Sequence, residues 1–119
     1  MEHLRFEWDP DKATANLKKH GVSFEEARSS FFDQFARIIS DSEHSEGEHR
    51  LILLGLSIKL NVLVIPHVAT DMEEVIEEQS EVQGKARKKK RIETYTLIRI
   101  ISARKADPAE RRKYAEFLP

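Results

Sequence analysis

Three apolar runs limit the folds open to this chain more than any other feature. They read RLILLGLS (50–57), LNVLVIPHV (60–68) and YTLIRIIS (95–102). Each is too short to cross a membrane as a helix, and each is rich in the residues that favour buried β-strands. A short turn separates the first two runs, which predicts a hairpin of central strands, and the third supplies another long strand. The core is therefore expected to form around a sheet.

Helix signals surround these strands. An N-cap aspartate followed by proline predicts a helix over residues 10–20, and Gly21 should end it. Ser23 begins a capping box for a second helix, which should end near Asp33. The aspartate–proline pair recurs at Asp107 and predicts a C-terminal helix.

Shorter strands are expected over residues 4–8 and 36–40. The element order is then strand, two helices, a run of antiparallel strands and a helix, which predicts an α+β fold in one domain over residues 1–119. With the two N-terminal helices on one face of the antiparallel sheet, the other face can carry polar side chains, and we expect function there. Pro66 lacks an N–H donor, so its end of the strand should lie at a sheet edge or a bulge.

The segment 70–94 separates two strands that a tight turn would otherwise join. One interpretation is a short acidic helix over residues 71–83, stopped by Gly84. Another is a disordered or domain-swapped excursion. The acidic run 71–81 and the basic run 85–91 can also face and neutralise each other.

Charge is uneven along the chain, although the net charge is only −1. Residues 1–84 carry 8 Lys/Arg against 17 Asp/Glu, whereas residues 85–119 carry 12 against 4. The C-terminal third is therefore a candidate surface for a polyanion. The chain has no cysteine, which excludes cysteine nucleophiles and cysteine-based zinc sites. No secretory signal or membrane span is recognisable, so a cytoplasmic protein without membrane contacts is expected.

The last long strand places charge among apolar residues. Arg99 interrupts an apolar row, and an arginine in that position needs a carboxylate partner or an anionic ligand, because burying its charge alone is costly. Arg104 and Lys105 follow at the end of the strand, beside the start of the next helix. Arg50 and His67, at the ends of neighbouring strands, are expected to converge on the same positive region.

Three stretches together resemble the BrnT family, the toxin components of bacterial type II toxin–antitoxin modules. They are FEWDPDKATANLKKHGVSFEEA (6–27), DSEHSEGEHRLILLGLS (41–57) and IRIISARKADPAERRKY (98–114). The resemblance implies a RelE-like fold, a ribonuclease that blocks translation, and neutralisation by a DNA-binding ribbon-helix-helix antitoxin. Compared with the family pattern, this chain carries a charged insertion within 70–94.

Metal-independent RNA cleavage uses the 2′-hydroxyl of the substrate, so the protein must supply proton transfer and cations for the developing charge. Candidates for phosphate contacts are Arg50, Arg99 and Arg104, since a guanidinium binds phosphate through two parallel hydrogen bonds, with Lys105 as an auxiliary cation. Further basic residues expected to contact RNA are Lys19, Arg111 and Arg112.

Proton transfer is assigned first to His67, because an imidazole titrates near neutral pH. His20, beside Lys19 at the end of the first helix, is the second candidate, and Glu48 is a candidate carboxylate base. No residue spacing indicates a metal site, and no cofactor is expected.

Each assignment has a structural alternative. Arg99 can pair with Glu48 or Glu7, His67 can be a surface strand residue, and His20 can interact with a helix dipole. The cations of the last helix can form a solvated face or contact the antitoxin. They are Arg111, Arg112 and Lys113.

The expected partners are RNA and the antitoxin, with DNA contacted only through the antitoxin complex. An exposed strand edge and the inserted segment would also permit a homodimer. Two competing hypotheses remain. One is a catalytically silent, antitoxin-binding partner that acts in transcriptional autorepression, and the other is an unrelated scaffold whose charged segment recruits a protein.

Overall fold

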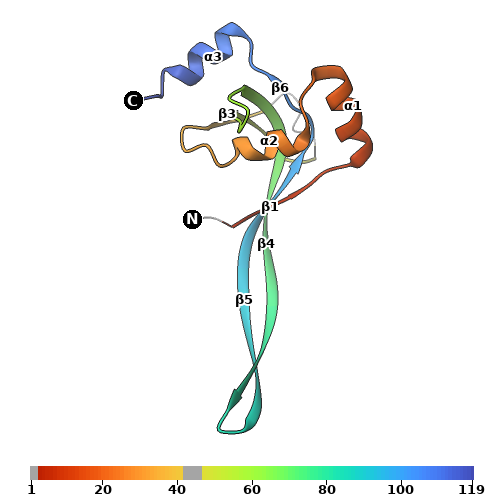
Figure 1. Ribbon diagram of the computed structural model, residues 1–119, viewed down its shortest axis with the longest axis vertical. Helices are drawn as coiled ribbons and strands as arrows, with labels where there is room; N and C mark the ends of the chain where they lie inside the picture. Colours follow the sequence, from red (N-terminus) through yellow and green to blue (C-terminus); the bar gives the residue numbers. More distant parts are fainter. Residues whose placement is uncertain (1–2, 42–46) are drawn as a thin grey trace.

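The computed structural model describes residues 3–41 and 47–119, which form three helices and one six-stranded sheet (Figure 1). The helices are α1 (Pro10–His20), α2 (Phe24–Ser30) and α3 (Pro108–Ala115). The strands are β1 (Leu4–Glu7), β2 (Arg37–Ser40), β3 (Arg50–Leu56), β4 (Val62–Val82), β5 (Lys85–Ile100) and β6 (Arg104–Lys105). The predicted α+β fold is confirmed.

The helices begin and end where their capping residues lie. The Asp9 carboxylate accepts a hydrogen bond from the Asp11 amide at 2.8 Å, and Gly21 ends α1 in the left-handed conformation, at φ 70°. Ser23 caps α2 by accepting from the Glu26 amide. This helix ends at Ser30 rather than near Asp33, because the next residues form turns.

The strand order in the sheet is β1-β5-β4-β3-β2, and β6 pairs with β4. Strands β2 to β6 pair in an antiparallel manner, as expected, whereas β1 pairs in parallel with β5. The sheet is therefore mixed.

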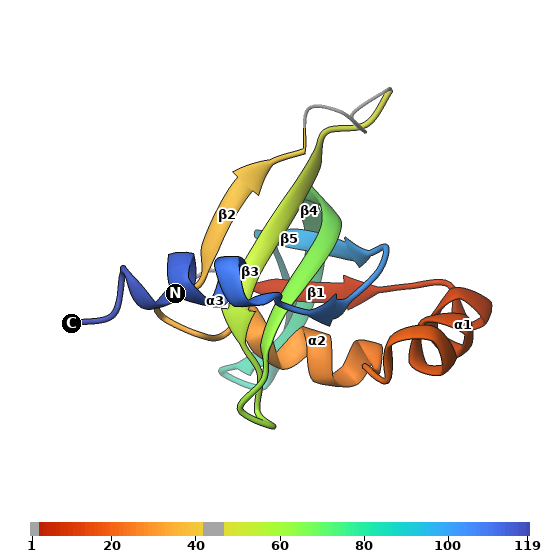
Figure 2. The same cartoon turned by 90° about the horizontal axis from the view of Figure 1, so that it is seen from above.

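Helices α1 and α2 cover one face of the sheet, which we call the helix face (Figure 2). The core lies between these helices and the sheet. There, Phe24 and Ala27 of α2 pack on Leu63, Ile65 and other sheet residues that are almost completely buried. On the opposite face, which we call the open face, α3 is the one helix that crosses the sheet among residues 3–41 and 47–119. This helix lies over the end of the sheet that carries Leu54 and Leu56 of β3, with which it shares two hollows.

A buried side chain ties α1 to the sheet. The Asn16 amide donates to the carbonyls of Val22 and Ala103 at 2.9 and 2.8 Å, and its oxygen accepts from the Ala103 amide at 3.1 Å. All three bonds lie in a region closed to water, where an unpaired polar group would be costly. Asn16 therefore fixes α1 against the segment that joins β5 to β6.

The chain forms a β-bulge between β5 and β6. From His67 to Val64, β4 advances three residues, while its partner advances four, from Ile100 to Arg104. Pro66 lies beside this bulge, and a bulge was one of the two positions predicted for this proline. The other alternative, a sheet edge, is wrong, because Pro66 pairs with Ile52 on one side and its carbonyl accepts from Ile101 on the other.

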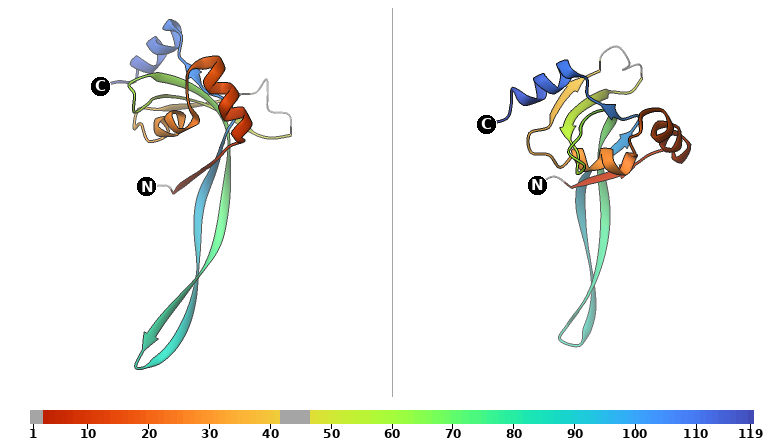
Figure 3. Two further views of the ribbon diagram at one scale, coloured as in Figure 1. Left: turned by 45° about the vertical axis from the view of Figure 1, so that its right-hand side comes forward. Right: turned by 45° about the horizontal axis from the view of Figure 1, so that its top comes forward.

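Strands β4 and β5 continue past the sheet as a two-stranded ribbon over residues 72–95, which we call the arm (Figures 1 and 3). Beyond the pairing of Thr96 with β1, no third strand accompanies them among the described residues. The arm stretches the molecule to 64 Å in its longest dimension, with a radius of gyration of 18.3 Å. A compact chain of this length has a radius of gyration of about 13.5 Å.

The arm corrects two predictions for segment 70–94. The predicted acidic helix is wrong, and so is disorder, because the segment forms paired strands. Gly84 does not stop a helix but occupies a two-residue turn with Gln83, at φ 75° and 53°, which is the geometry of a type I′ hairpin. The predicted neutralisation is confirmed in part, because ion pairs join Lys88 to Glu77 and Arg91 to Glu78.

Candidate functional site

Two predicted arginines lie in one row across the open face. Arg50 of β3 pairs with Val68 of β4, and Val68 pairs with Arg99 of β5. Directly paired residues project to the same side of a sheet, so both guanidinium groups belong to the open face. Two interstrand spacings separate their backbones, about 10 Å. A phosphate between them lies within reach of both side chains.

A second row of the same face carries two more arginines. Val64 of β4 pairs with Leu54 of β3 and with Arg104 of β6, and Leu54 pairs with Arg37 of β2. The β-bulge is the reason that Arg104 points to the same face as Arg99. Sequence reasoning missed Arg37, which lies in a predicted strand but whose direction depends on the register with β3.

Arg99 is held by a carboxylate in this structure. Its guanidinium forms an ion pair with Glu48, one of the two partners proposed as alternatives from the sequence. The Arg99 and Glu48 side chains are 36% and 57% exposed, and an ion pair this accessible contributes at most about 1 kcal/mol. A phosphate, which accepts two hydrogen bonds from one guanidinium, can therefore replace Glu48 at little cost.

Arg104 is held more firmly. Its two terminal nitrogens donate to the two Glu110 oxygens at 2.8 and 2.9 Å, and Glu110 also completes the capping box of α3 with Asp107. The Arg104 guanidinium and the backbone amide of Asp107 outweigh the effect of burial and lower the pKa of Glu110 to about 2. This geometry fits a residue that fixes the start of α3 better than one that binds substrate.

His67 does not reach the open face. It pairs with Leu51 and Ile100 in a row of the helix face, is completely buried, and packs against the edge of Phe31, with ring centroids 4.9 Å apart. Burial lowers the pKa of His67, although a hydrogen bond from Nδ1 to the Ile65 carbonyl opposes the shift. The expectation that His67 converges with the arginines is wrong, because side chains alternate along β4 and it is the next residue, Val68, that lies in the row of Arg50 and Arg99.

The other predicted residues lie elsewhere. Lys19 and His20 end α1 on the helix side of the sheet. Lys105 pairs with Leu63 and so points away from the open face, and Arg111 and Arg112 are exposed on α3. None of these five residues belongs to the Arg50–Arg99 row.

The position of α3 over the open face is set by Asp33. Its carboxylate accepts from the Leu56 and Phe35 amides and from the Tyr114 hydroxyl at 2.5 Å. Burial alone would raise the pKa of Asp33, but these hydrogen bonds outweigh it and lower the pKa. Burial and the bond to Asp33 raise the pKa of Tyr114 to about 12.

Two hollows flank α3. One, of about 310 Å³, is lined by Arg37, Ile39, Leu54, Lys113, Glu116 and Phe117, and the Arg37 guanidinium lies 3.5 Å from the centre of the Phe117 ring. The other, of about 850 Å³, is mainly apolar and includes Phe32, Leu56, Val62, Tyr114 and Leu118. The smaller hollow therefore adds two cations, Arg37 and Lys113, to the part of the open face that α3 covers.

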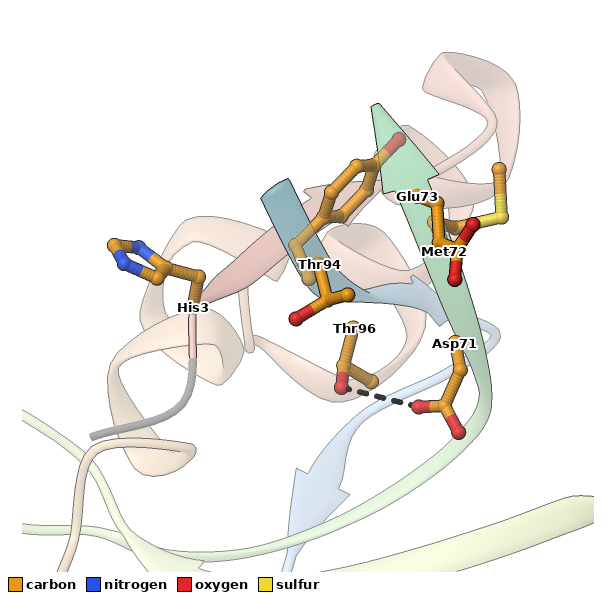
Figure 4. A pocket seen from close by; sticks show the side chains of 7 residues that line it. His3, Asp71, Met72, Glu73, Thr94 and Thr96 are labelled. Carbon is orange, nitrogen blue, oxygen red and sulfur yellow. Dashed lines mark hydrogen bonds between the residues drawn. The ribbon is translucent and has the colours of Figure 1, made fainter. Parts of the chain in front are cut away.

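A further hollow of about 490 Å³ lies where the arm leaves the sheet (Figure 4). Asp71 and Glu73 line it, together with His3, Thr94 and Thr96, and the Thr96 hydroxyl donates to Asp71 at 3.5 Å. Two carboxylates without a lysine or arginine among the lining residues disfavour a phosphate. Among residues 3–41 and 47–119, no three potential metal ligands come together, and no helix is long and apolar enough to cross a membrane.

The Arg50–Arg99 row thus combines two guanidinium groups with two carboxylates, Glu48 on Arg99 and Glu7 of β1, which pairs with Arg99 in the sheet. Arg50 and Arg99 are placed to hold a phosphate, and Glu48 lies on Arg99. A carboxylate freed from its arginine by an incoming phosphate can accept a proton beside that phosphate. This arrangement suits phosphodiester chemistry.

Comparison with known proteins identifies a family. A family described as "Ribonuclease toxin, BrnT, of type II toxin-antitoxin system" matches residues 8–80, which include both N-terminal helices, Arg50 and the outgoing strand of the arm as far as Ser80. The match does not extend over Arg99 or α3. A search of curated proteins found no match.

Proposed function

Because this chain belongs to the BrnT family of type II toxin–antitoxin ribonuclease toxins, we propose that it cleaves RNA on the open face of its sheet, between Arg50 and Arg99. The observation that carries the proposal is their shared row, in which Val68 alone separates them. We further propose that the reaction needs no metal and that it stops translation in the cytoplasm.

The mechanism begins with an exchange of partners. The scissile phosphate displaces Glu48 from Arg99, and the two guanidinium groups hold its non-bridging oxygens. Glu48 then takes the proton of the adjacent 2′-hydroxyl, whose oxygen attacks the phosphorus. The arginines stabilise the negative charge of the pentacovalent intermediate. As the bond to the 5′-oxygen breaks, this oxygen takes a proton from water, so the products are a 2′,3′-cyclic phosphate and a 5′-hydroxyl.

His67 has no place in this mechanism as it lies in the structure, because the imidazole is buried on the other face. Arg104 is proposed to act by positioning α3 rather than by contacting RNA. Lys19, His20, Lys105, Arg111 and Arg112 remain candidates for contacts with more distant parts of the RNA.

The proposal is tested by incubating the purified protein with RNA in the presence of EDTA. Arg99→Ala should lower the cleavage rate by about 100-fold or more, as expected for a group that stabilises transition-state charge. Arg28→Ala, which removes an exposed cation from α2 on the opposite side, should leave the rate unchanged. Cleavage by Arg99→Ala at the rate of the unmodified protein would refute the site.

The role of Glu48 has its own signature. Glu48→Gln should remove the part of the pH–rate profile that rises as a carboxylate loses its proton, whereas Glu25→Gln on α2 should leave the profile intact. If Glu48 only holds Arg99 in place, the pH–rate profile of Glu48→Gln keeps its shape, and the cleavage rate changes by the same factor at every pH. RNA cleaved only when Mg²⁺ is restored would refute metal independence.

A second candidate function is a catalytically silent partner of the antitoxin. The ion pair between Arg99 and Glu48 and the burial of His67 favour it, since both leave the open face without a free catalytic group in this state. Membership of a type II toxin–antitoxin family implies an antitoxin. We propose that this antitoxin is of the ribbon-helix-helix kind and that DNA is contacted through it. Intact RNA at every pH and protein concentration would favour the silent partner.

A further inference from the structure

The arm divides into two parts of opposite charge. Near the sheet, residues 72–75 and 92–95 carry three glutamates and no lysine or arginine. Farther out, residues 76–91 carry six lysines and arginines against three glutamates, and every residue from 81 to 91 is exposed. The distal part, which we call the tip, therefore has a net charge of +3 and is displayed almost entirely to solvent.

Ion pairing within the arm does not neutralise the tip. Glu77 pairs with Lys88 at 3.7 Å, and Arg91 pairs with both Glu78 and Glu93. Within the part of the chain that the structure describes, no ion pair engages the other four cations of the tip. They are Lys85, Arg87, Lys89 and Lys90.

The cations point to both sides of the ribbon. Side chains alternate along β5, so Lys85, Arg87 and Lys89 share one side, whereas Lys88 and Lys90 share the other. An A-form RNA duplex has a deep, narrow major groove and a wide, shallow minor groove bordered by phosphates. Cations on both sides of the ribbon can contact the phosphates along the edges of this wide groove.

The base of the arm is braced against the sheet. The Arg5 guanidinium of β1 donates to Glu74 at 2.5 Å and lies 4.0 Å from the centre of the Tyr95 ring. From Val68 in the arginine row to the end of β4 at Val82 there are 14 strand residues, which span about 45 Å. The tip is therefore held at a distance from the candidate site and contacts a different part of any bound molecule.

We infer that the tip is a second anion-binding site that holds the phosphodiester backbone of structured RNA at a distance from the cleavage site. The inference rests on the proposed function for the choice of RNA. Phosphates fit the tip because it offers an array of lysines and arginines without a carboxylate partner. A membrane surface fits poorly, since the tip has only two large apolar residues, Ile76 and Val82, and no aromatic residue.

The test compares two variants that lose three positive charges each. The tip variant is Lys85→Gln, Arg87→Gln and Lys89→Gln, all on one side of the ribbon. The matched control is Lys12→Gln, Lys18→Gln and Lys59→Gln, three exposed lysines of α1 and of the turn between β3 and β4. Fluorescence anisotropy measures binding to a 2′-O-methylated RNA duplex, which cannot be cleaved, over a series of salt concentrations.

We expect the tip variant to bind at least 10-fold more weakly at 0.1 M salt, and the slope of log K against log salt to fall in magnitude by about 2 to 3, close to one unit for each lost phosphate contact. The control variant should bind within twofold of the unmodified protein. Equal binding by all three proteins would overturn the inference. Thermal melts that coincide for the three proteins exclude unfolding as the cause of any loss.

Two further ligands identify what the tip holds. Loss of binding to both the RNA duplex and a DNA duplex of the same sequence supports a phosphodiester site, and loss only for DNA overturns the choice of RNA. Polyglutamate is the third ligand. If it binds as tightly as RNA and the tip variant loses this binding to the same extent, the assignment of phosphate as the ligand is overturned, and an acidic protein is indicated instead. Because the duplex is not cleavable, tip-dependent binding without RNA cleavage by the unmodified protein would refute the proposed function and leave this inference standing.

Discussion

Strands β4 and β5 pass through two regions that are held together in different ways. In the sheet, Ile65 and Ile100 are buried on the helix face and have neighbouring strands on both sides of the hairpin. In the arm, the same two strands are charged and have only each other. A two-stranded ribbon is marginally stable in water by itself, so the arm persists because the sheet fixes its register. The arm therefore depends on the sheet for its stability.

The largest effect is expected from a cavity in the sheet region. Ile65→Ala should lower the free energy of unfolding by about 3 kcal/mol, because Ile65 is completely buried and the space it leaves cannot be filled by water. Chemical denaturation measures the change. A loss below about 1 kcal/mol would mean that the core tolerates a cavity. The contrast between a tightly packed sheet and an exposed arm would then not hold.

A smaller loss is expected from the polar link between α1 and the sheet. Asn16→Ala should cost about 2 kcal/mol, since it leaves the Val22 and Ala103 carbonyls and the Ala103 amide without their partner in a buried site. Lys18→Ala is a matched control, because it truncates an exposed polar side chain of the same helix and should change stability by less than about 0.5 kcal/mol. Equal stability of the two variants would contradict the role assigned to Asn16.

The start of α3, which belongs neither to the sheet nor to the arm, should contribute to stability in a way that depends on pH. Arg104 lowers the pKa of Glu110 from 4.5 to about 2, so the folded state keeps this carboxylate charged where the unfolded chain protonates it. The contribution is therefore complete above pH 4.5 and is lost as the pH falls toward 2. Glu110→Gln should cost about 1 kcal/mol at pH 7, because the pair is partly exposed, and the cost should disappear as the pH falls through about 2. Urea titrations at several pH values measure this, and a difference that persists at the acid end would count against the pair.

The smallest effect is expected in the arm. Val75 and Ile92 pair across the arm but are 66% and 65% exposed. Val75→Thr keeps a β-branched side chain and should change the free energy of unfolding by less than about 0.5 kcal/mol. A larger loss in dilute solution would show that the pair is buried by another molecule, which a dependence of stability on protein concentration would reveal.

Sequence reasoning succeeded where the signal is local. Asp9, Ser23 and Asp107 cap their helices as predicted, because a capping hydrogen bond joins residues two or three positions apart. The apolar runs also predicted the central strands correctly, since burial on both faces of a strand selects such runs. The α+β class follows from these elements.

The arm and the site were harder to predict because they depend on pairing between distant residues. The glutamates of β4 favour a helix locally, and only the register with β5 makes them strand residues. His67 was placed at a strand end because the strand was expected to stop at residue 68, whereas it continues to Val82. The common direction of Arg50 and Arg99 follows from a register that no single segment contains.

The bulge before Arg104 has a consequence for how this sequence tolerates change. Strand residues alternate between two environments, so the additional residue between Ile100 and Arg104 shifts the phase of everything after it. A deletion of one residue there would turn Lys105 outward and Arg104 toward the helices, and it would break the pair that starts α3. A length change at this point therefore reverses the two surfaces of the C-terminal end, which no substitution of similar size can do.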